Sequence, residues 1–420
     1  MPQMDGGFAT HEPRSDRACM TLEVDEVAAF VTRHLAGCRR HEEAPLAAAS
    51  GRVLAEDVVA TMELPPFDQS AVDGYALRTA DLKAIGFPLP VAGTIRAGDP
   101  FPPGGSGVAR VLTGAPVPSG AAAIVMQEHV LRDGGTIRLA DAVRPGANIR
   151  RRGEDVANGE AVVRAGTLLD ARHLALFAAL GCAAIPVRPR VRAAILALGD
   201  ELVAPGSSRL PHQINDANSA MAAAVLRRHG AEIVEAERVP DCADTVREAI
   251  GRRIGEVDLI VTSGGMAAGD TDHARTAVEA CGGRWFSMGI RMKPGKPAAF
   301  AEVSGTGVVG LPGNPFAALV AMIVVGLPVL GALAGSEQRL DVAPAVAAFD
   351  LDRQPGRAEF FPARRVPSDV GALAIDRLGK GGSARLRPLV DADGLGLIRA
   401  DAGRVSVGDP VGYVAFRTIV

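Results

Sequence analysis

Aromatic side chains are scarce in this chain of 420 residues, and it carries no surplus of positive charge. Phe, Trp and Tyr together make up 4% of the residues, and the formal net charge is −3 at pH 7. A general nucleic-acid binder needs a basic surface and often stacks bases on aromatic rings. We therefore expect no nucleic-acid partner.

Cysteines are few and widely scattered. No CxxC pair or Cys/His cluster at zinc-binding spacing occurs, so the thiols are interpreted as buried or incidental ones in a reducing compartment. The first 18 residues are polar and lack the apolar centre of a secretory signal, which favours a cytoplasmic location. No Ser-His-Asp or Cys-His spacing suggests covalent nucleophilic catalysis. The five cysteines are Cys19, Cys38, Cys182, Cys242 and Cys281.

Only one uncharged stretch approaches the length of a membrane span, at residues 316–335. Gly326 and Pro328 interrupt it, no basic flank follows, and a loop-like GLPGNP motif precedes it. We therefore expect a buried core helix followed by a linker, and no membrane contact.

The first 188 residues predict a β-rich insertion between two helical segments. Apolar residues recur at helical spacing in residues 22–37 and 166–181. Residues 59–149 are instead rich in Pro and Gly, with short β-prone pieces. We expect the two helical segments to pack together. At this length the chain should hold three or four domains.

Regular alternation begins at residue 189. Apolar strands are expected at residues 191–199, 231–239 and 257–265, each followed by a helical pattern, and Asp216 is a plausible N-cap of the first helix. Such alternation predicts a parallel sheet covered on both faces. After residue 340, short strand-like pieces indicate a closing β-rich domain.

Three polar motifs follow strands of this predicted sheet: GDELVAPG (199–206), TSGGMAAGDTD (262–272) and GLPGNP (310–315). Each alone could be a helix cap or a plain turn. Ligands of open α/β sheets bind beyond the C-terminal strand ends, and glycine-rich loops at helix N-termini present N–H groups to anions. Together the three loops predict a site for a phosphate- or pterin-like ligand.

MKPGKP (292–297) holds two lysines in a rigid turn between prolines and a glycine. Surface lysines often serve only solubility, but fixed ammonium groups suit phosphate or another oxyanion. The carboxylates Glu201, Asp270 and Asp272 on neighbouring loops suit a hard divalent cation such as Mg²⁺.

The stretch PPFDQSAVDGYAL (65–77) concentrates polar residues behind two prolines. Most such stretches are solvent-facing turns. Phe67 and Tyr75 can anchor this one by packing, which would hold Asp68 and Asp73 in place.

These motifs, with LTGAPVP, NIRRRGED and INDANS between them, occur in an order that resembles the molybdopterin molybdenumtransferase family (the MoeA type, related to the C-terminal part of gephyrin). The resemblance covers about residues 20–420. It implies a multidomain α/β and β fold: a central parallel α/β molybdopterin-binding domain, a discontinuous helical linker or dimerisation domain, an inserted β-rich domain and a C-terminal β domain. The implied bounds are 189–335 for the α/β domain and 20–58 with 150–188 for the helical domain. They are 59–149 for the inserted domain and 340–420 for the C-terminal domain.

The resemblance also implies an activity: insertion of molybdenum from molybdate into adenylylated molybdopterin, with divalent-cation-dependent release of AMP. The implied cofactor is Mg²⁺. The family forms homodimers, with a site between the α/β domain of one subunit and the inserted and C-terminal regions of the other. A molybdopterin adenylyltransferase is a possible partner.

Site residues carry over from the family by motif. Catalytic positions are Asp73, Thr113, Glu201, Asp241, Asp272, Lys293, Lys296 and Ser383. The SGG loop and the proline-rich loop would bind the pterin or phosphate through Ser263, Gly264, Gly265, Pro312, Gly313, Asn314 and Pro315. The metal would be held by Glu201, Asp272 and Asp270.

The chain departs from the family pattern at Gly289, where many members carry a basic residue that Arg291 could replace, and at Ala384, where His is common. Asp270 is also a variable position. Two alternatives stay open. The chain could be a molybdopterin adenylyltransferase, which shares the TSGG and GNP loops but is usually a single domain. It could also be a non-catalytic cofactor-binding scaffold, although its carboxylates and lysines are retained.

Overall fold

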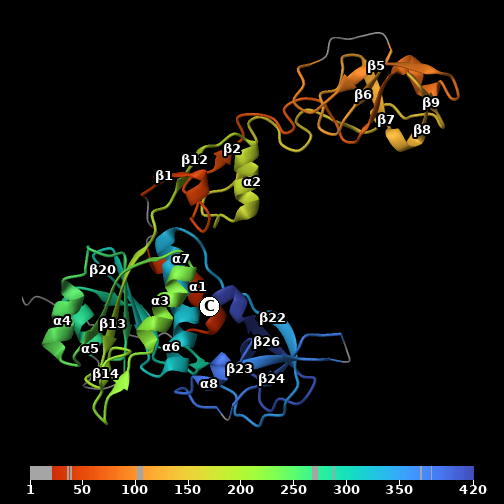
Figure 1. Ribbon diagram of the computed structural model, residues 1–420. Helices are drawn as coiled ribbons and strands as arrows, with labels where there is room; N and C mark the ends of the chain where they lie inside the picture. The colour runs from red at the N-terminus through yellow and green to blue at the C-terminus, as the bar shows by residue number, and fades with distance from the viewer. Residues whose placement is uncertain are drawn as a thin grey trace, which may run out of the picture. The chain divides into compact units, whose positions relative to one another are not determined.

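The computed structural model describes residues 21–35, 37, 40–101, 107–266, 273–286, 289–368, 371–379 and 381–420 (Figure 1). These residues form two compact units, which we describe separately. The smaller unit contains residues 43–50 and 54–187. The larger contains the described residues up to 42, residues 51–53 and residues 188–420.

The larger unit contains a six-stranded sheet in which four neighbouring strands are parallel. They include the three strands predicted at residues 191–199, 231–239 and 257–265, so the prediction of a parallel sheet is confirmed for them. The additional strand β20 runs antiparallel to both of its neighbours, β21 and β18. Only Ser304 and Gly305, both at positive φ, separate β20 from β21, and such a two-residue turn makes an antiparallel hairpin. The order is β16 (Glu232–Val239), β13 (Arg192–Leu198), β17 (Leu259–Ser263), β21 (Thr306–Leu311), β20 (Ala299–Val303) and β18 (Arg284–Trp285).

Helices cover both faces of this sheet, as the alternating apolar strands predict (Figure 1). Ala193 and Ile195 of β13 belong to a core with α1 (Val27–His34) and α3 (Asn218–Arg228). The alternate residues of β13 belong to a second core with α4 (Ala243–Gly251) and α5 (His273–Ala280). The N-cap of α3 is Ala217 and not the predicted Asp216, which lies one residue earlier. The Asp216 carboxylate still accepts a hydrogen bond from the Ser219 N–H at 3.0 Å, in the first turn of α3.

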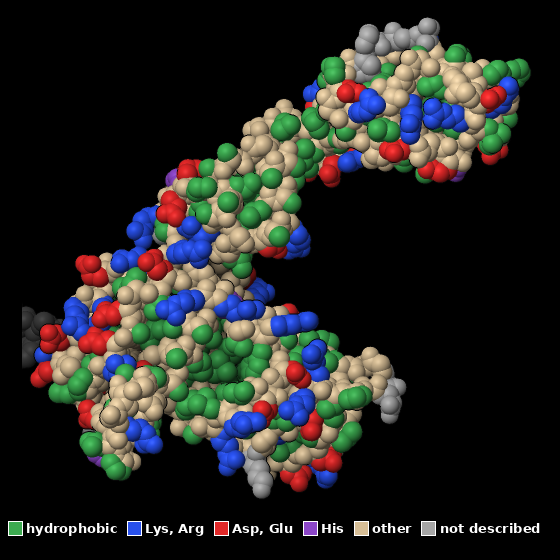
Figure 2. Space-filling model, in the orientation of Figure 1, with side chains coloured by type: hydrophobic (Ala, Val, Ile, Leu, Met, Phe, Trp, Pro, Cys, Tyr) green, Lys and Arg blue, Asp and Glu red, His purple; other side chains and the backbone are tan. Residues whose placement is uncertain are grey.

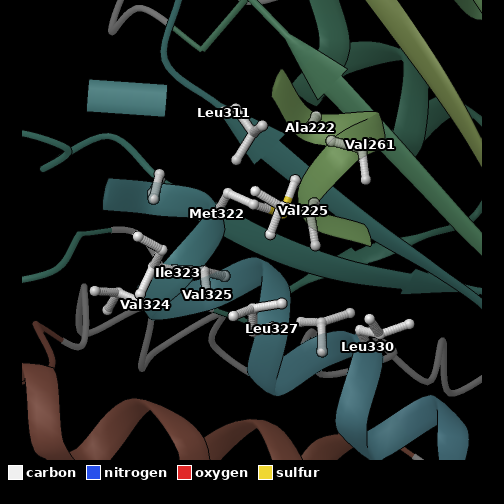
Figure 3. Close-up of a cluster of buried hydrophobic side chains, with 14 of the residues drawn as sticks. Ala222, Val225, Val261, Leu311, Met322, Ile323, Val324, Val325, Leu327 and Leu330 are labelled. Carbon is white, nitrogen blue, oxygen red and sulfur yellow. The ribbon is translucent and has the colours of Figure 1, made fainter. Parts of the chain in front are cut away.

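The long apolar segment is a buried core helix, as predicted. It is the only helix in the described part of the chain that is long and apolar enough to span a membrane, and it is entirely buried. Figure 3 shows its side chains packed beside Val261 and Leu311 of the sheet. The helix does not stop at Gly326 or Pro328, because a π turn absorbs the irregularity and Pro328 falls in the first turn of the next helix. Its parts are α6 (Pro315–Ala321), the π turn η5 (Met322–Gly326) and α7 (Leu327–Ala334).

The two predicted helical segments fall in different units. Helix α1, preceded by the 3₁₀ turn η1 (Val24–Glu26), contacts α7 and η5 and buries Phe30 in their core. Helix α2 (Ala171–Ala179), with Asp170 as N-cap, contacts η2 (Leu46–Ala48) in the smaller unit. The two chain segments meet through strands instead. β1 (Glu42–Pro45) pairs with β12 (Ala184–Val187), and β2 (Val58–Val59) pairs with β11 (Ala161–Val163).

The region predicted to be β-rich forms a second six-stranded sheet, in the smaller unit. Its apolar core includes Tyr75, Leu77 and Ile137. A short separate pair joins β3 (Gln69–Ser70) to β10 (Ile149–Arg150). The sheet order is β7 (Ala121–Met126), β4 (Gly74–Arg78), β6 (Val108–Val111), β5 (Leu89–Ile95), β9 (Thr136–Leu139) and β8 (Val130–Asp133), with η3 (Thr79–Lys83) and η4 (Gln127–His129) in its connections.

A third sheet closes the larger unit, and its last strand, β25, pairs with both β26 and β23. The MKPGKP segment joins it, because β19 (Met292–Lys293) pairs in parallel with β23. Two short helices, α8 (Arg387–Val390) and α9 (Phe416–Ile419), complete the region. The order is β19, β23 (Ala358–Val366), β24 (Ala374–Arg377), β22 (Ala343–Ala347), β26 (Pro410–Ala415) and β25 (Gly394–Ile398).

The described cysteines are free thiols. Cys182 and Cys281 are half-buried, whereas Cys242 is exposed at the N-terminus of α4. Hydrogen bonds from the backbone N–H groups of Thr245 and Asp244 lower the pKa of the Cys242 thiol. Cys19 and Cys38 lie outside the described residues.

Candidate functional site

A cavity of about 440 Å³ opens in the larger unit, between the loops of the α/β sheet and the C-terminal sheet. Its volume falls in the range of small-molecule sites. MKPGKP forms one wall, the GLPGNP loop and the start of α6 form another, and the C-terminal sheet supplies the rest. The lining residues that carry the argument are Lys293, Lys296, Pro312, Asn314, Arg357, Glu359, Arg377, Ser383 and Arg385.

Positive charge dominates this cavity: its described lining holds five cationic side chains and one carboxylate. Lys293 and Lys296 were predicted from the MKPGKP motif. Arg357, Arg377 and Arg385 were not, because no motif contains them, although Arg377 stands two residues before the GKGGS motif. Figure 2 shows blue and red side chains interspersed on the visible face, with no broad basic surface there. The concentrated charge suits a compact anion rather than a nucleic acid.

The single carboxylate, Glu359, is buried behind the cations. Its Oε1 accepts a hydrogen bond from Arg377 Nη2 at 3.0 Å. Its Oε2 lies 3.5 Å from Arg353 Nε and 3.7 Å from Lys293 Nζ. A carboxylate in a low-dielectric position is stable only with such partners.

Arg291 does not replace the basic residue absent at position 289. Its Nη1 forms an ion pair with Glu23 at 2.7 Å, and its Nε donates to the Gly356 carbonyl at 2.9 Å. The Arg291 side chain is thus bound elsewhere and does not line the cavity. Arginines of the C-terminal region add positive charge to the cavity in addition to the two lysines.

The predicted proline-rich loop and Ser383 meet at the cavity. The Asn314 side-chain amide donates to Ser383 Oγ at 2.9 Å, and the Phe316 N–H donates to the Ser383 carbonyl at 3.0 Å. Pro315 occupies the first turn of α6, as its fixed φ favours. These bonds tie the α/β region to the C-terminal sheet.

The SGG motif forms a tight turn at the end of β17. Gly264 has φ +88°, and a Cβ there would lie 2.5 Å from the Leu198 carbonyl oxygen, so only glycine fits. The side-chain amide of Asn218, from the INDANS motif, donates to both Ser263 Oγ and the Gly313 carbonyl at 2.8 Å. Asn218 therefore binds the SGG turn to the GLPGNP loop, a role the sequence did not reveal.

The predicted carboxylates Glu201 and Asp241 follow the adjacent parallel strands β13 and β16. Glu201 is exposed, next to the short strand pair β14 (Leu202–Val203) and β15 (Ile214–Asn215). Asp241 Oδ1 is buried without a hydrogen-bond partner, while the Asp241 N–H donates to Asp200 at 3.1 Å. The described residues include no group of three or more His, Cys, Asp or Glu placed to hold a metal ion. Asp270 and Asp272 lie outside the described residues.

Asp73 and Thr113 lie together in the smaller unit. Asp73 Oδ1 accepts hydrogen bonds from both the Thr113 N–H and its hydroxyl, each at 2.8 Å. These donors, with a smaller contribution from Arg110, hold the pKa of Asp73 below its usual value. Asp68 is instead bound by Arg151 and the Arg152 N–H, at 2.6 and 2.9 Å, so it shapes the turn.

Replacing Thr113 by Val should raise the pKa of Asp73 toward the ordinary value of 3.8, because it removes the hydroxyl donor. The native carboxylate contributes to stability at neutral pH, and this contribution is lost as pH falls through its lowered folded pKa. In the variant the folded pKa lies closer to the unfolded one, so this contribution should be smaller and its loss should be complete at a higher pH. A carboxyl ¹³C NMR titration measures the shift. Thr113→Ser should keep the native pKa, and an unchanged pKa in the Val variant would contradict the prediction.

Comparison with known proteins decides the family. Models of the MoeA N-terminal region (domains I and II), of a probable molybdopterin-binding domain and of the MoeA C-terminal region (domain IV) match residues 22–181, 194–332 and 344–416. A molybdopterin molybdenumtransferase of Haemophilus influenzae is 33% identical over 95% of this chain and 100% of its own length. The chain belongs to the MoeA family.

Other MoeA relatives agree. Molybdopterin molybdenumtransferase 2 of Mycobacterium tuberculosis is 37% identical over 87% of this chain and 92% of that protein. The crystal structure of the molybdopterin biosynthesis MoeA protein from Pyrococcus horikoshii superposes with a TM-score of 0.78, at 27% identity, covering 94% of this chain and 100% of that one. The predicted multidomain fold class is confirmed, and the chain is a transferase of molybdenum cofactor biosynthesis.

Proposed function

We propose that this MoeA protein transfers molybdenum from molybdate to the dithiolene of adenylylated molybdopterin and releases AMP. The observation that carries the proposal is the cavity with five cationic side chains and one carboxylate. Molybdate is a compact tetrahedral dianion, and several cations gathered around one cavity stabilise such charge better than a single lysine does.

Lysine and arginine have different tasks in this proposal. Lys293 and Lys296 bind molybdate oxygens as mobile point charges, and Arg377 presents a planar set of N–H donors. Ser383 and Asn314 add polar contacts from the opposite wall. The SGG turn offers backbone N–H groups to the pterin or a phosphate. Asp73, ionised at neutral pH, can accept a proton or orient a substrate group.

A divalent cation fits the carboxylate side of the site. The buried, unpartnered Asp241 Oδ1 is an oxygen ligand of the type that Mg²⁺ prefers, and Glu201 lies on the adjacent loop. Asp270 and Asp272 remain predicted ligands. Bound there, Mg²⁺ would neutralise phosphoanhydride charge while AMP leaves.

We further propose that the protein is cytoplasmic and acts as a homodimer, as the family resemblance implies. The scattered cysteines suit a reducing compartment. An adenylyltransferase would supply the adenylylated substrate, because nothing in the proposed reaction forms the phosphoanhydride that it breaks.

The adenylyltransferase alternative is less favoured because of how the cavity is built. Arg357, Arg377 and Ser383 come from the C-terminal sheet, which a single α/β domain lacks. A scaffold without turnover would not need a cation-lined cavity.

An assay with purified protein separates these functions. Adenylylated molybdopterin, molybdate and MgCl₂ are mixed with the protein, and AMP is measured by chromatography. We expect AMP release that depends on molybdate and yields cofactor able to activate an apo-molybdoenzyme. Adenylylation of molybdopterin from MgATP without molybdate would support the alternative, and no AMP release under any condition would support the scaffold.

A further inference from the structure

The cationic side chains of the cavity differ in how they are held. Lys293 is 57% exposed and could adopt many rotamers, and Arg377 reaches the lining from β24. Flexible cations lose entropy when they bind an anion, so a site gains affinity if they are already in place. The contacts that hold these two residues therefore matter for affinity.

Both residues contact the same carboxylate. Glu359 lies directly across from Lys293 in the β19–β23 pairing, and its Oε2 is 3.7 Å from Lys293 Nζ. Its Oε1 accepts the hydrogen bond from Arg377 Nη2 at 3.0 Å. The Arg377 guanidinium also lies 5.4 Å from the centre of the Phe361 ring, which limits its movement from another side.

Glu359 is itself fixed by a cation that does not line the cavity. The buried Arg353 lies 3.5 Å from Glu359 Oε2, and its other nitrogens donate to backbone carbonyls, including those of Arg399 at 3.1 Å and Ala402. Glu359 is only 5% exposed. The carboxylate thus has a rigid support on one side and the cavity cations on the other.

We propose that Glu359 is a positioning residue: anchored by Arg353, it holds Arg377 and Lys293 in the geometry that binds the oxyanion. Its negative charge alone would weaken anion binding, so its benefit must come from orientation. The inference rests on the proposed function, because it takes molybdate as the ligand of this cavity.

The test measures binding without turnover. Molybdate is titrated by calorimetry into the full chain, with no molybdopterin present. Glu359→Gln keeps the shape but removes the charge that holds both cations. We expect molybdate affinity to fall about tenfold, within the usual range of coupling in such networks. An effect of charge alone would strengthen binding, because the one carboxylate among the described lining residues is lost. Unchanged or tighter binding would overturn the proposal.

Coupling with Arg377 separates positioning from general support of the fold. We expect Arg377→Lys to weaken binding about tenfold in the native chain and less than twofold when combined with Glu359→Gln. Equal losses in both backgrounds would overturn the proposal. Glu359→Asp should recover part of the affinity, because it retains the charge. If Glu359→Gln does not fold, Arg377→Lys alone still tests the proposal. Full molybdate affinity in the Arg377→Lys variant would contradict a positioned Arg377.

A matched control is Glu237, a carboxylate also held by two arginines, Arg252 and Arg253, but outside the cavity lining. Glu237→Gln should leave molybdate affinity unchanged. The outcome also distinguishes this inference from the proposed reaction. Native binding with the expected coupling but no AMP release would refute only the reaction, whereas no molybdate binding by the native chain would refute the positioning role.

Discussion

Replacing Lys293 by Ala should reduce molybdate-dependent AMP release by at least about a hundredfold. Removal of one preorganised charged or hydrogen-bonding donor at a developing anion typically costs a factor of 10²–10³ in turnover. Lys293 lies on the cavity wall, and its ammonium group is one of the five cationic groups of the described lining. The measurement is the initial rate of AMP formation at saturating adenylylated molybdopterin, with molybdate varied.

Lys83 supplies the control for this prediction. It is an exposed lysine in η3 of the smaller unit, and Lys83→Ala should leave the rate within a factor of two. Lys293→Arg, which keeps the charge but changes its shape, should lose less activity than Lys293→Ala. If Lys293→Ala retains the native rate at every molybdate concentration, the cavity is not where molybdate reacts.

Replacing Phe300 by Ala should lower the free energy of unfolding of the larger unit by about 3–5 kcal/mol. Phe300 is fully buried in β20. Its ring is stacked 5.3 Å from that of Phe286 and lies edge-on at 6.0 Å from Phe30, measured between ring centroids. Its removal leaves a cavity that three different elements would have to fill. Urea unfolding followed by the fluorescence of Trp285, the only tryptophan in the chain, measures the change.

Val390 is the matched control for stability. It lies in α8 of the same unit and is 79% exposed, so Val390→Ala should change the free energy of unfolding by less than about 0.5 kcal/mol. A loss below about 1 kcal/mol in Phe300→Ala would mean that the core around β20 repacks easily. The N-terminal helix would then not depend on this aromatic contact.

Two of the strands predicted from sequence, β13 and β17, are buried along almost their whole length. Residues 193–198 and 259–261 are continuous apolar runs because helices cover both faces of these strands, and this pattern needs no knowledge of the rest of the fold. The short strands β18 and β19 could not be predicted. They contain only two residues each, among them Arg284 and Lys293, and they exist because a neighbouring strand provides a partner.

Helix packing was harder to predict than helix location. The periodicity of residues 22–37 correctly indicates a helix, but an apolar face does not specify its partner. Phe30 packs near Phe300, which is remote in sequence. The π turn at 322–326 was missed for a related reason: Gly326 and Pro328 disfavour a regular helix, but the surrounding apolar core keeps the segment helical.

The candidate site also contains some residues that the sequence identifies and others that it does not. Lys293, Ser263 and Asn314 belong to motifs whose glycines and prolines mark unusual backbone, so sequence alone identifies them. Arg377 and Glu359 lie within ordinary β-strands and become part of the cavity only through strand pairing. Residues that reach a site only because distant strands pair carry no recognisable pattern in the neighbouring sequence.

The hydrogen bonds of the Asn218 side-chain amide connect separate segments of the candidate site. The Asn218 amide donates hydrogen bonds to Ser263 and to the Gly313 carbonyl. Asn314, the residue after Gly313, donates a hydrogen bond to Ser383 of the C-terminal region. A movement of the SGG turn would therefore reach the cavity wall through the two hydrogen bonds of Asn218, the Gly313–Asn314 peptide bond and the hydrogen bond to Ser383. In the reaction proposed above, a ligand at the SGG turn and an oxyanion in the cavity would therefore influence each other's binding without direct contact.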